Sequence, residues 1–143
     1  MQKGIDYIGI CIGFNCHDGN GNFLMSKRSK NTRDEQGNWD FGGSGLELGE
    51  KVEDCLRREL REEYGVQNIK YDFLGYLDIF RKINNINTHW ISLEFLVQVD
   101  PKEVINGEPH KFEEIGWFKL NDLPSPLHSS VPTILEKFKD KLK

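Results

Sequence analysis

The sequence predicts an α/β protein in which a mixed β-sheet is covered by helices on both faces. Two observations lead to this class. Strand-like segments rich in β-branched and aromatic residues lie on both sides of one central helical segment, and an amphipathic helical segment stands near the carboxyl end. With 143 residues, the chain is expected to form a single domain over residues 1–143, with a core of ordinary size.

The amino-terminal part alternates strand-like runs with turn and loop signals. We predict, in order, a buried strand at Tyr7–Phe14, a turn at His17–Asn22, the returning strand of a hairpin at Phe23–Ser29, a polar loop at Lys30–Asn38 and a short strand at Trp39–Phe41. Four glycines then fall between Phe41 and Glu50, where we expect a tight loop that folds back over the following helix.

The central helix is predicted over Lys51–Tyr64, with Gly65 as the left-handed residue that ends it. The remaining elements are two long antiparallel strands at Ile69–Arg81 and Thr88–Asp100, a further strand at Lys111–Leu120 and an amphipathic helix at Val131–Leu142. Pro132 would stand in the first turn of the last helix, where a missing backbone N–H costs little.

Composition excludes several classes of protein. A net charge of −4 argues against a broad basic surface, so we expect no DNA or RNA polymer as a partner. The amino-terminal apolar run is too short to span a bilayer, and no membrane association is expected. Cys11, Cys16 and Cys55 are odd in number and lack zinc-site spacing, which predicts reduced thiols and a cytoplasmic location.

The central helix carries carboxylates on the stripe that should face the core. On a helical wheel the stripe consists of Val52, Cys55 and Leu56, followed by Glu59, Glu62 and Glu63. Arg57, Arg61 and Asp54 point to the opposite side. Inward carboxylates need compensation. Either basic neighbours such as Arg58 and Lys51 pair with them, or divalent cations bind there, and the wheel alone leaves both open.

The glycine loop and the helix together resemble the Nudix box: Gly, five residues, Glu, seven residues, then Arg-Glu-apolar-any-Glu-Glu-any-Gly-apolar. The matching positions are Glu50, Arg58, Glu59, Leu60, Glu62, Glu63, Gly65 and Val66. Ser44 stands where the box begins with glycine, with Gly43 and Gly45 on either side, and Gly42 replaces the usual preceding proline.

This resemblance implies a Nudix-type α/β/α sandwich on a mixed β-sheet. It also implies a hydrolase that cleaves the pyrophosphate bond of a nucleoside diphosphate derivative with Mg²⁺ or Mn²⁺. The residues that it assigns to metal binding are Glu59, Glu62, Glu63 and the carbonyl of Gly43, while Glu50, Arg58 and Gly65 would hold the loop and helix together. Glu113 is the candidate for a downstream catalytic carboxylate, with Glu114 next to it. Only one of these two can face the site, because adjacent strand residues point to opposite faces.

The small-molecule substrate is less well defined. Lys27 and Arg28 end a strand and are candidates to contact phosphate, although a solvated strand end is an equal alternative. Four aromatic residues are candidates to stack on a base, although each is more often a core residue: Trp39, Phe80, Trp90 and Trp117.

The sequence leaves three functions to be distinguished. The first is cleavage of a nucleoside triphosphate, modified or not, to the monophosphate and pyrophosphate, and the second is cleavage of ADP-ribose or a nucleotide sugar. The third is a non-catalytic nucleotide-binding domain. The sequence does not decide whether the protein forms a homodimer.

Overall fold

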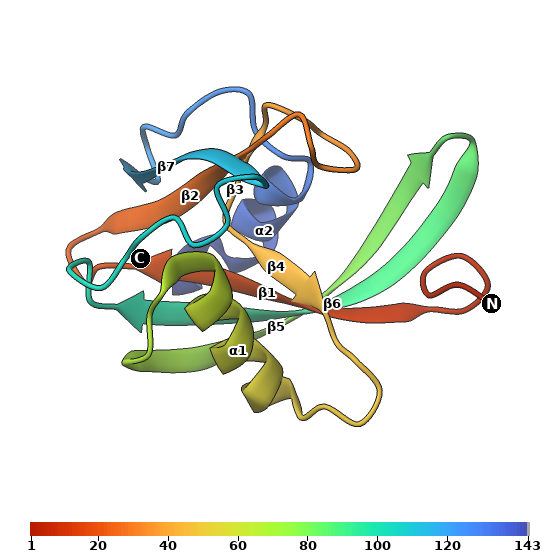
Figure 1. The fold of residues 1–143 in the computed structure, drawn as a ribbon, viewed down its shortest axis with the longest axis horizontal. Helices are drawn as coiled ribbons and strands as arrows, with labels where there is room; N and C mark the ends of the chain where they lie inside the picture. Colours follow the sequence, from red (N-terminus) through yellow and green to blue (C-terminus); the bar gives the residue numbers. More distant parts are fainter. Residues whose placement is uncertain (143) are drawn as a thin grey trace.

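One mixed β-sheet with a helix on each face forms the body of the protein (Figure 1). A computed structural model describes residues 1–142. The elements in chain order are β1 (Gly9–His17), β2 (Asn22–Arg28), β3 (Trp39–Asp40), β4 (Gly43–Gly45), α1 (Val52–Tyr64), β5 (Ile69–Ile83), β6 (Ile86–Val99), β7 (Phe112–Lys119), α2 (Ser130–Phe138) and the 3₁₀ helix η1 (Lys139–Lys141). The predicted fold class is confirmed. No helix within residues 1–142 has both the length and the apolar character needed to cross a bilayer.

The sheet is mixed because β1 and β6 run parallel while the other pairs are antiparallel. Its main path is β3-β2-β1-β6-β5, with β7 on β2 and β4 on β1. One edge of β1 is divided between two partners, because Cys11–Gly13 pairs with β4 whereas His17 pairs with β2. The glycine-rich segment therefore enters the sheet beside β1.

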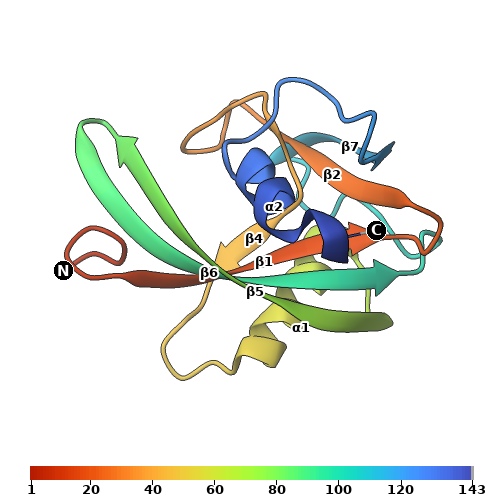
Figure 2. The same cartoon turned by 180° about the vertical axis from the view of Figure 1, so that it is seen from behind.

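Two cores flank the sheet (Figures 1 and 2). On one face α1 packs Leu56 and Leu60 against Phe14 of β1. On the other face α2 packs Ile134 and Phe138 against residues of β5 and the β3–β4 segment. Each helix thus buries one apolar side and exposes the other, as the amphipathic patterns predict.

The β5–β6 hairpin continues beyond the sheet as a two-stranded arm (Figures 1 and 2). Pairing with β1 begins only at Trp90, opposite Gly9. The strands are longer than predicted, because Asn84 and Asn85 adopt φ values of 50° and 67° and close a two-residue turn. The carboxyl-terminal helix is shorter than predicted, since α2 ends at Phe138 and η1 follows.

The glycine segment departs most from its prediction. Gly43–Gly45 is not a loop but the short strand β4, which pairs with Cys11–Gly13. A Cβ atom at Gly43 would lie 2.7 Å from the carbonyl oxygen of Ile12, so the close approach requires glycine there. Helix α1 begins at Val52, one residue later than predicted, and ends at Tyr64 as predicted, where Gly65 has a φ of 70°.

Candidate active site

Two of the three carboxylates on the α1 stripe are buried. Glu59 is 7% exposed and Glu63 is 3% exposed, as the helical wheel predicted. Glu62 differs, because its side chain is 50% exposed at the solvent edge of the stripe. The three residues predicted to face water, Asp54, Arg57 and Arg61, are exposed.

Arg58 bridges the glycine-rich segment and the carboxylates of α1. Its Nε and Nη2 donate to Glu50 at 2.8 and 3.1 Å. Its Nη1 donates to Glu59 at 2.7 Å and to Glu62 at 3.4 Å. The bond from Arg58 lowers the pKa of the Glu50 carboxyl. The ion-pair explanation for inward carboxylates therefore holds for Glu59.

Glu63 is different, because no basic side chain within residues 1–142 forms an ion pair with it, and its Oε2 atom is buried without a hydrogen-bond partner. The Tyr64 hydroxyl beside it is also buried without a partner. Burial, with the negative charge of Glu59, raises the pKa of the Glu63 carboxyl well above its ordinary value. An oxygen of this kind fits a divalent cation as its missing partner.

The described residues do not already enclose a metal ion. Within residues 1–142, no three acidic, histidine or cysteine side chains are gathered in such an arrangement. Arg58 pairs with two of the three stripe carboxylates, Glu59 and Glu62. The unpaired Glu63 oxygen is the observation that fits an ion.

The pH dependence of stability in the metal-free protein follows from Glu63. Because its pKa is raised by folding, its contribution is fully present below the unfolded value of about 4.5 and is lost as the pH rises through the folded pKa. We therefore expect urea denaturation in chelator to show lower stability at pH 8 than at pH 5.5. In Glu63→Gln the loss of stability between pH 5.5 and pH 8 should be smaller. An equal loss in wild type and variant would contradict a raised pKa at Glu63.

The loop before β7 contributes two charged residues that the sequence analysis missed. The backbone N–H of Gly107 donates to the carbonyl of Glu63 at 2.8 Å, which fixes the loop against the end of α1. The Glu108 carboxylate pairs with Lys111 at 3.0 Å. Both charges act on Glu63, with Glu108 raising and Lys111 lowering its pKa.

The predicted downstream carboxylate, Glu113, lies on β7 beside Glu114. Glu113 and Glu114 are exposed on β7, and Glu113 pairs with Lys27 at 3.3 Å. Spacing in the sequence could not distinguish Glu108 from Glu113, because the position of Glu108 depends on how the loop packs against α1. Glu108 follows Gly107 in the loop that packs on the end of α1, and its charge raises the pKa of Glu63.

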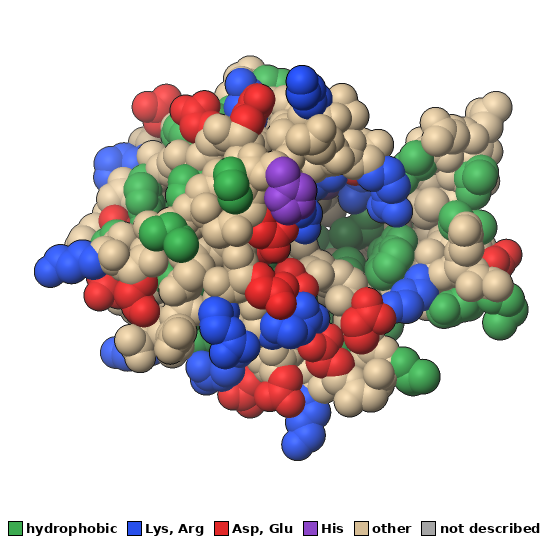
Figure 3. All heavy atoms as spheres, viewed as in Figure 1, with side chains coloured by type: hydrophobic (Ala, Val, Ile, Leu, Met, Phe, Trp, Pro, Cys, Tyr) green, Lys and Arg blue, Asp and Glu red, His purple; other side chains and the backbone are tan. Residues whose placement is uncertain are grey.

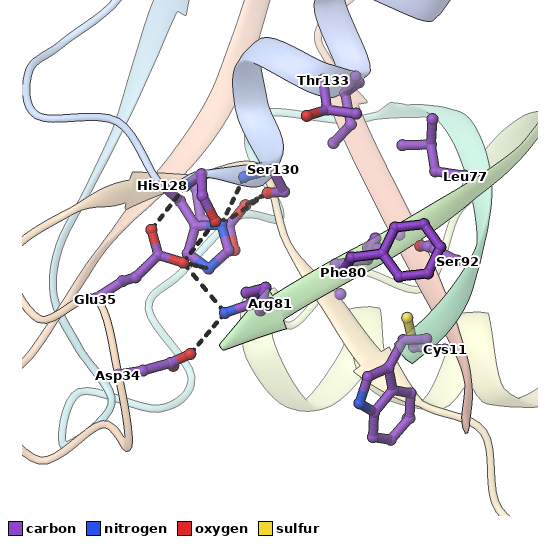
Figure 4. Close-up of a pocket in the computed structure, with 18 of the residues that line it drawn as sticks. Cys11, Asp34, Glu35, Leu77, Phe80, Arg81, Ser92, His128, Ser130 and Thr133 are labelled. Carbon is purple, nitrogen blue, oxygen red and sulfur yellow. Dashed lines mark hydrogen bonds and ion pairs between the residues drawn. The ribbon is translucent and has the colours of Figure 1, made fainter. Parts of the chain in front are cut away.

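A large pocket lies on the α2 side of the sheet (Figure 4). Its volume is about 920 Å³, near the upper end of the range for small-molecule sites. Figure 3 shows a hollow between the body and the arm, bordered by hydrophobic and basic side chains. Phe80 and Trp90 line it, together with Asp40 and the Gly42–Gly45 segment. Asp40 links this pocket to the carboxylates of α1, since its charge also raises the pKa of Glu63.

One rim of the pocket is fixed by charged groups from three segments (Figure 4). Arg81 donates to Asp34 at 2.6 Å and to Glu35 at 3.1 Å. Glu35, which has a φ of 49°, also accepts from the backbone N–H of Ser129 at 2.7 Å and pairs with His128 at 2.9 Å. A strained residue held by several partners is typical of functional sites.

The four predicted substrate-binding residues lie in different surroundings. Arg28 borders the pocket, but its guanidinium forms an ion pair with Asp34 at 2.9 Å. Lys27 forms an ion pair with Glu113. Trp39 is only 6% exposed and packs against Phe118. Trp117 packs against the core under α1. The sequence analysis weighed Phe80 and Trp90 as well, and these two are the aromatic residues that border the pocket.

Comparison with protein families gives one match over most of the chain. The model described as NUDIX domain matches residues 10–138. Among curated proteins, the chain is 43% identical over 113 residues to the nucleoside triphosphatase NudI of Salmonella paratyphi B, which covers 72% of this chain and 77% of that protein. The same identity and coverage hold for NudI of Salmonella dublin.

Solved structures show the same fold. A MutT NUDIX hydrolase from Burkholderia pseudomallei superposes with a TM-score of 0.81 at 29% identity, covering 92% of this chain and 98% of that one. A MutT protein from Methanosarcina mazei Go1 gives a TM-score of 0.77 at 22% identity, covering 95% of this chain and 96% of that one.

Proposed function

This chain belongs to the Nudix family, and from that premise we propose that residues 1–143 form one catalytic domain that hydrolyses a nucleoside triphosphate to the monophosphate and pyrophosphate. The chain is a Nudix pyrophosphohydrolase. The name of its relatives, nucleoside triphosphatase, supports the triphosphate substrate. Its three thiols are free, which fits the reducing cytoplasm.

The unpaired Glu63 oxygen is the observation that carries the proposal. Members of the family use a divalent metal, and here we propose Mg²⁺ or Mn²⁺, held by the carboxylates of Glu59, Glu62 and Glu63 and the Gly43 carbonyl. Hard oxygen ligands of this kind suit either ion. Such an ion supplies neutralisation of phosphate charge and a more acidic bound water.

The protein's own groups have distinct parts in this reaction. Arg58 and Glu50 keep α1 and the glycine-rich segment in register through two hydrogen bonds. One of Glu59, Glu62 and Glu63, whichever is not fully occupied in binding metal, accepts the proton of the attacking water. Glu108 adds negative charge that acts on Glu63. It would take the role of downstream catalytic carboxylate that the sequence analysis assigned to Glu113.

The nucleoside is proposed to occupy the pocket of about 920 Å³. Phe80 is 70% exposed and, with Trp90, offers aromatic surface there. The Gly42–Gly45 segment borders the same pocket, and the phosphates would project past it toward Glu59, Glu62 and Glu63. The volume also leaves room for the second sugar of ADP-ribose or a nucleotide sugar, which is the alternative substrate class.

The non-catalytic alternative loses its main support. It depended on Ser44 in place of the first glycine of the box, which could have distorted the segment. Ser44 lies in β4 opposite Ile12, and its φ is not among the positive values in the chain. A serine in extended backbone carries no strain, so the departure from the box leaves the path of the segment intact.

A substrate panel tests the proposal. Purified protein with Mg²⁺ or Mn²⁺ should release pyrophosphate, not orthophosphate, from at least one of the common ribo- and deoxyribonucleoside triphosphates. ADP-ribose and nucleotide sugars in the same assay test the alternative. Chelator should abolish release. Binding of nucleotides without release of phosphate from any of them would favour the non-catalytic domain.

A further inference from the structure

Three buried polar side chains lie together under the floor of the pocket. Glu94 is 2% exposed, Ser92 is also 2% exposed, and Asn15 is fully buried. The Ser92 hydroxyl donates to Glu94 Oε2, and Asn15 Nδ2 donates to Glu94 Oε1 at 3.2 Å. Ser92 and Glu94 line the pocket. The proposed hydrolysis uses none of the three.

The backbone leaves space for the Glu94 carboxyl. Gly13 of β1 pairs with Glu94 of β6, and a Cβ atom at Gly13 would lie 1.9 Å from Glu94 Oε2. Gly13 also pairs with Gly43 on its other side. The carboxyl therefore lies across β1, next to the glycine-rich segment and facing the pocket.

The surroundings of Glu94 favour the uncharged acid. No basic side chain within residues 1–142 forms an ion pair with it, and an isolated buried carboxylate is costly. Burial raises the pKa of the Glu94 carboxyl, with a further contribution from the Asp40 charge on β3, against the hydrogen bonds from Ser92 and Asn15. The Cys11 thiol on β1 is the other titratable group beside it. A carboxylic acid offers an O–H donor next to a C=O acceptor.

We propose that Glu94 is the specificity-determining residue of the nucleotide pocket and selects bases with an amidine edge, as in adenine and cytosine. In such an edge a ring nitrogen accepts from the acid O–H, and the adjacent amino group donates to its C=O. Guanine and uracil place N–H where the acid needs an acceptor for its O–H. The inference rests on the proposed nucleotide-hydrolysing function.

The test is the ratio of kcat/KM between bases. Wild-type protein should prefer ATP and CTP over GTP and UTP, or the deoxy forms, by about ten- to hundredfold for two hydrogen bonds. In Glu94→Leu the ratio should fall close to one. Glu94→Gln keeps a donor beside an acceptor and should retain the order of preference. Thr133→Ala, another polar group of the pocket, should leave the ratio as in wild type.

A pH profile keeps the inference falsifiable if Glu94→Leu does not fold. As the pH rises through the raised pKa of Glu94, the acid loses its O–H, so the wild-type ratio should fall, whereas that of Glu94→Gln should stay flat. Taking a ratio cancels titration of the shared catalytic groups. A ratio near one in wild type, or one that is equal in wild type and Glu94→Leu, would overturn the inference.

Failure of the proposed function would give a different result. If wild type hydrolyses no nucleotide, calorimetric binding of AMP, CMP, GMP and UMP to wild type and Glu94→Leu still measures selection of the base. A preference for AMP and CMP that the variant loses would support the role of Glu94. Equal binding of all four to wild type would exclude it.

Discussion

Replacing Glu63 by glutamine is expected to abolish most hydrolysis while leaving the fold intact. Glutamine has the same shape but cannot carry the negative charge that a divalent ion requires, so kcat should fall by about 10²–10⁴-fold. The metal-free variant should be at least as stable as wild type at pH 8, because the buried oxygen without a partner no longer bears charge. Pyrophosphate release and chemical denaturation measure the two effects.

Thermal stability with added metal separates loss of binding from loss of chemistry. Mg²⁺ should raise the Tm of wild type, because a ligand that binds only the folded state stabilises it, and this increase should shrink in Glu63→Gln. Glu62→Gln should also reduce hydrolysis, but with little change in metal-free stability, because Glu62 is half exposed. Wild-type hydrolysis in a variant that carries both Glu62→Gln and Glu63→Gln would show that these carboxylates are not needed for the reaction.

Local patterns were enough to predict the catalytic helix. The 3.6-residue period places Glu59 and Glu63 on the apolar stripe, and Gly65 marks the end of the helix. These features depend only on residues within one helix. The wheel was less accurate for Glu62, because a residue at the edge of a stripe is exposed or buried according to what packs beside it.

Tertiary pairing determines the features that the sequence could not predict. The Glu94 carboxyl faces the pocket because β1 and β6 run parallel and place Gly13 opposite it. Glu108 approaches Glu63 because its loop packs on the end of α1. The glycine segment was expected to form a loop, since short glycine runs carry no strand pattern. It forms β4 because β1 leaves a free edge there.

Gly107→Ala is expected to disturb both stability and activity, because it changes the contact between the loop and α1. A Cβ atom at residue 107 would lie 2.2 Å from the carbonyl oxygen of Glu62 and 3.1 Å from that of Glu63. Both are backbone atoms of the catalytic helix and cannot rotate away. We expect a loss of about 1–3 kcal/mol in the free energy of unfolding, measured by urea denaturation.

The same substitution should lower kcat/KM by about 10²-fold, since displacing catalytic groups by about 1 Å has an effect of that size. The loop and α1 are joined by hydrogen bonds from Gly107 to Glu63 and from Ile105 to Tyr64, at 2.8 and 3.0 Å. Moving the loop therefore moves Glu108 relative to Glu63. Lys102→Ala, an exposed change in the same loop, should stay within about 0.5 kcal/mol of wild type and retain activity. Wild-type stability and activity in Gly107→Ala would mean that the loop does not position the acidic residues.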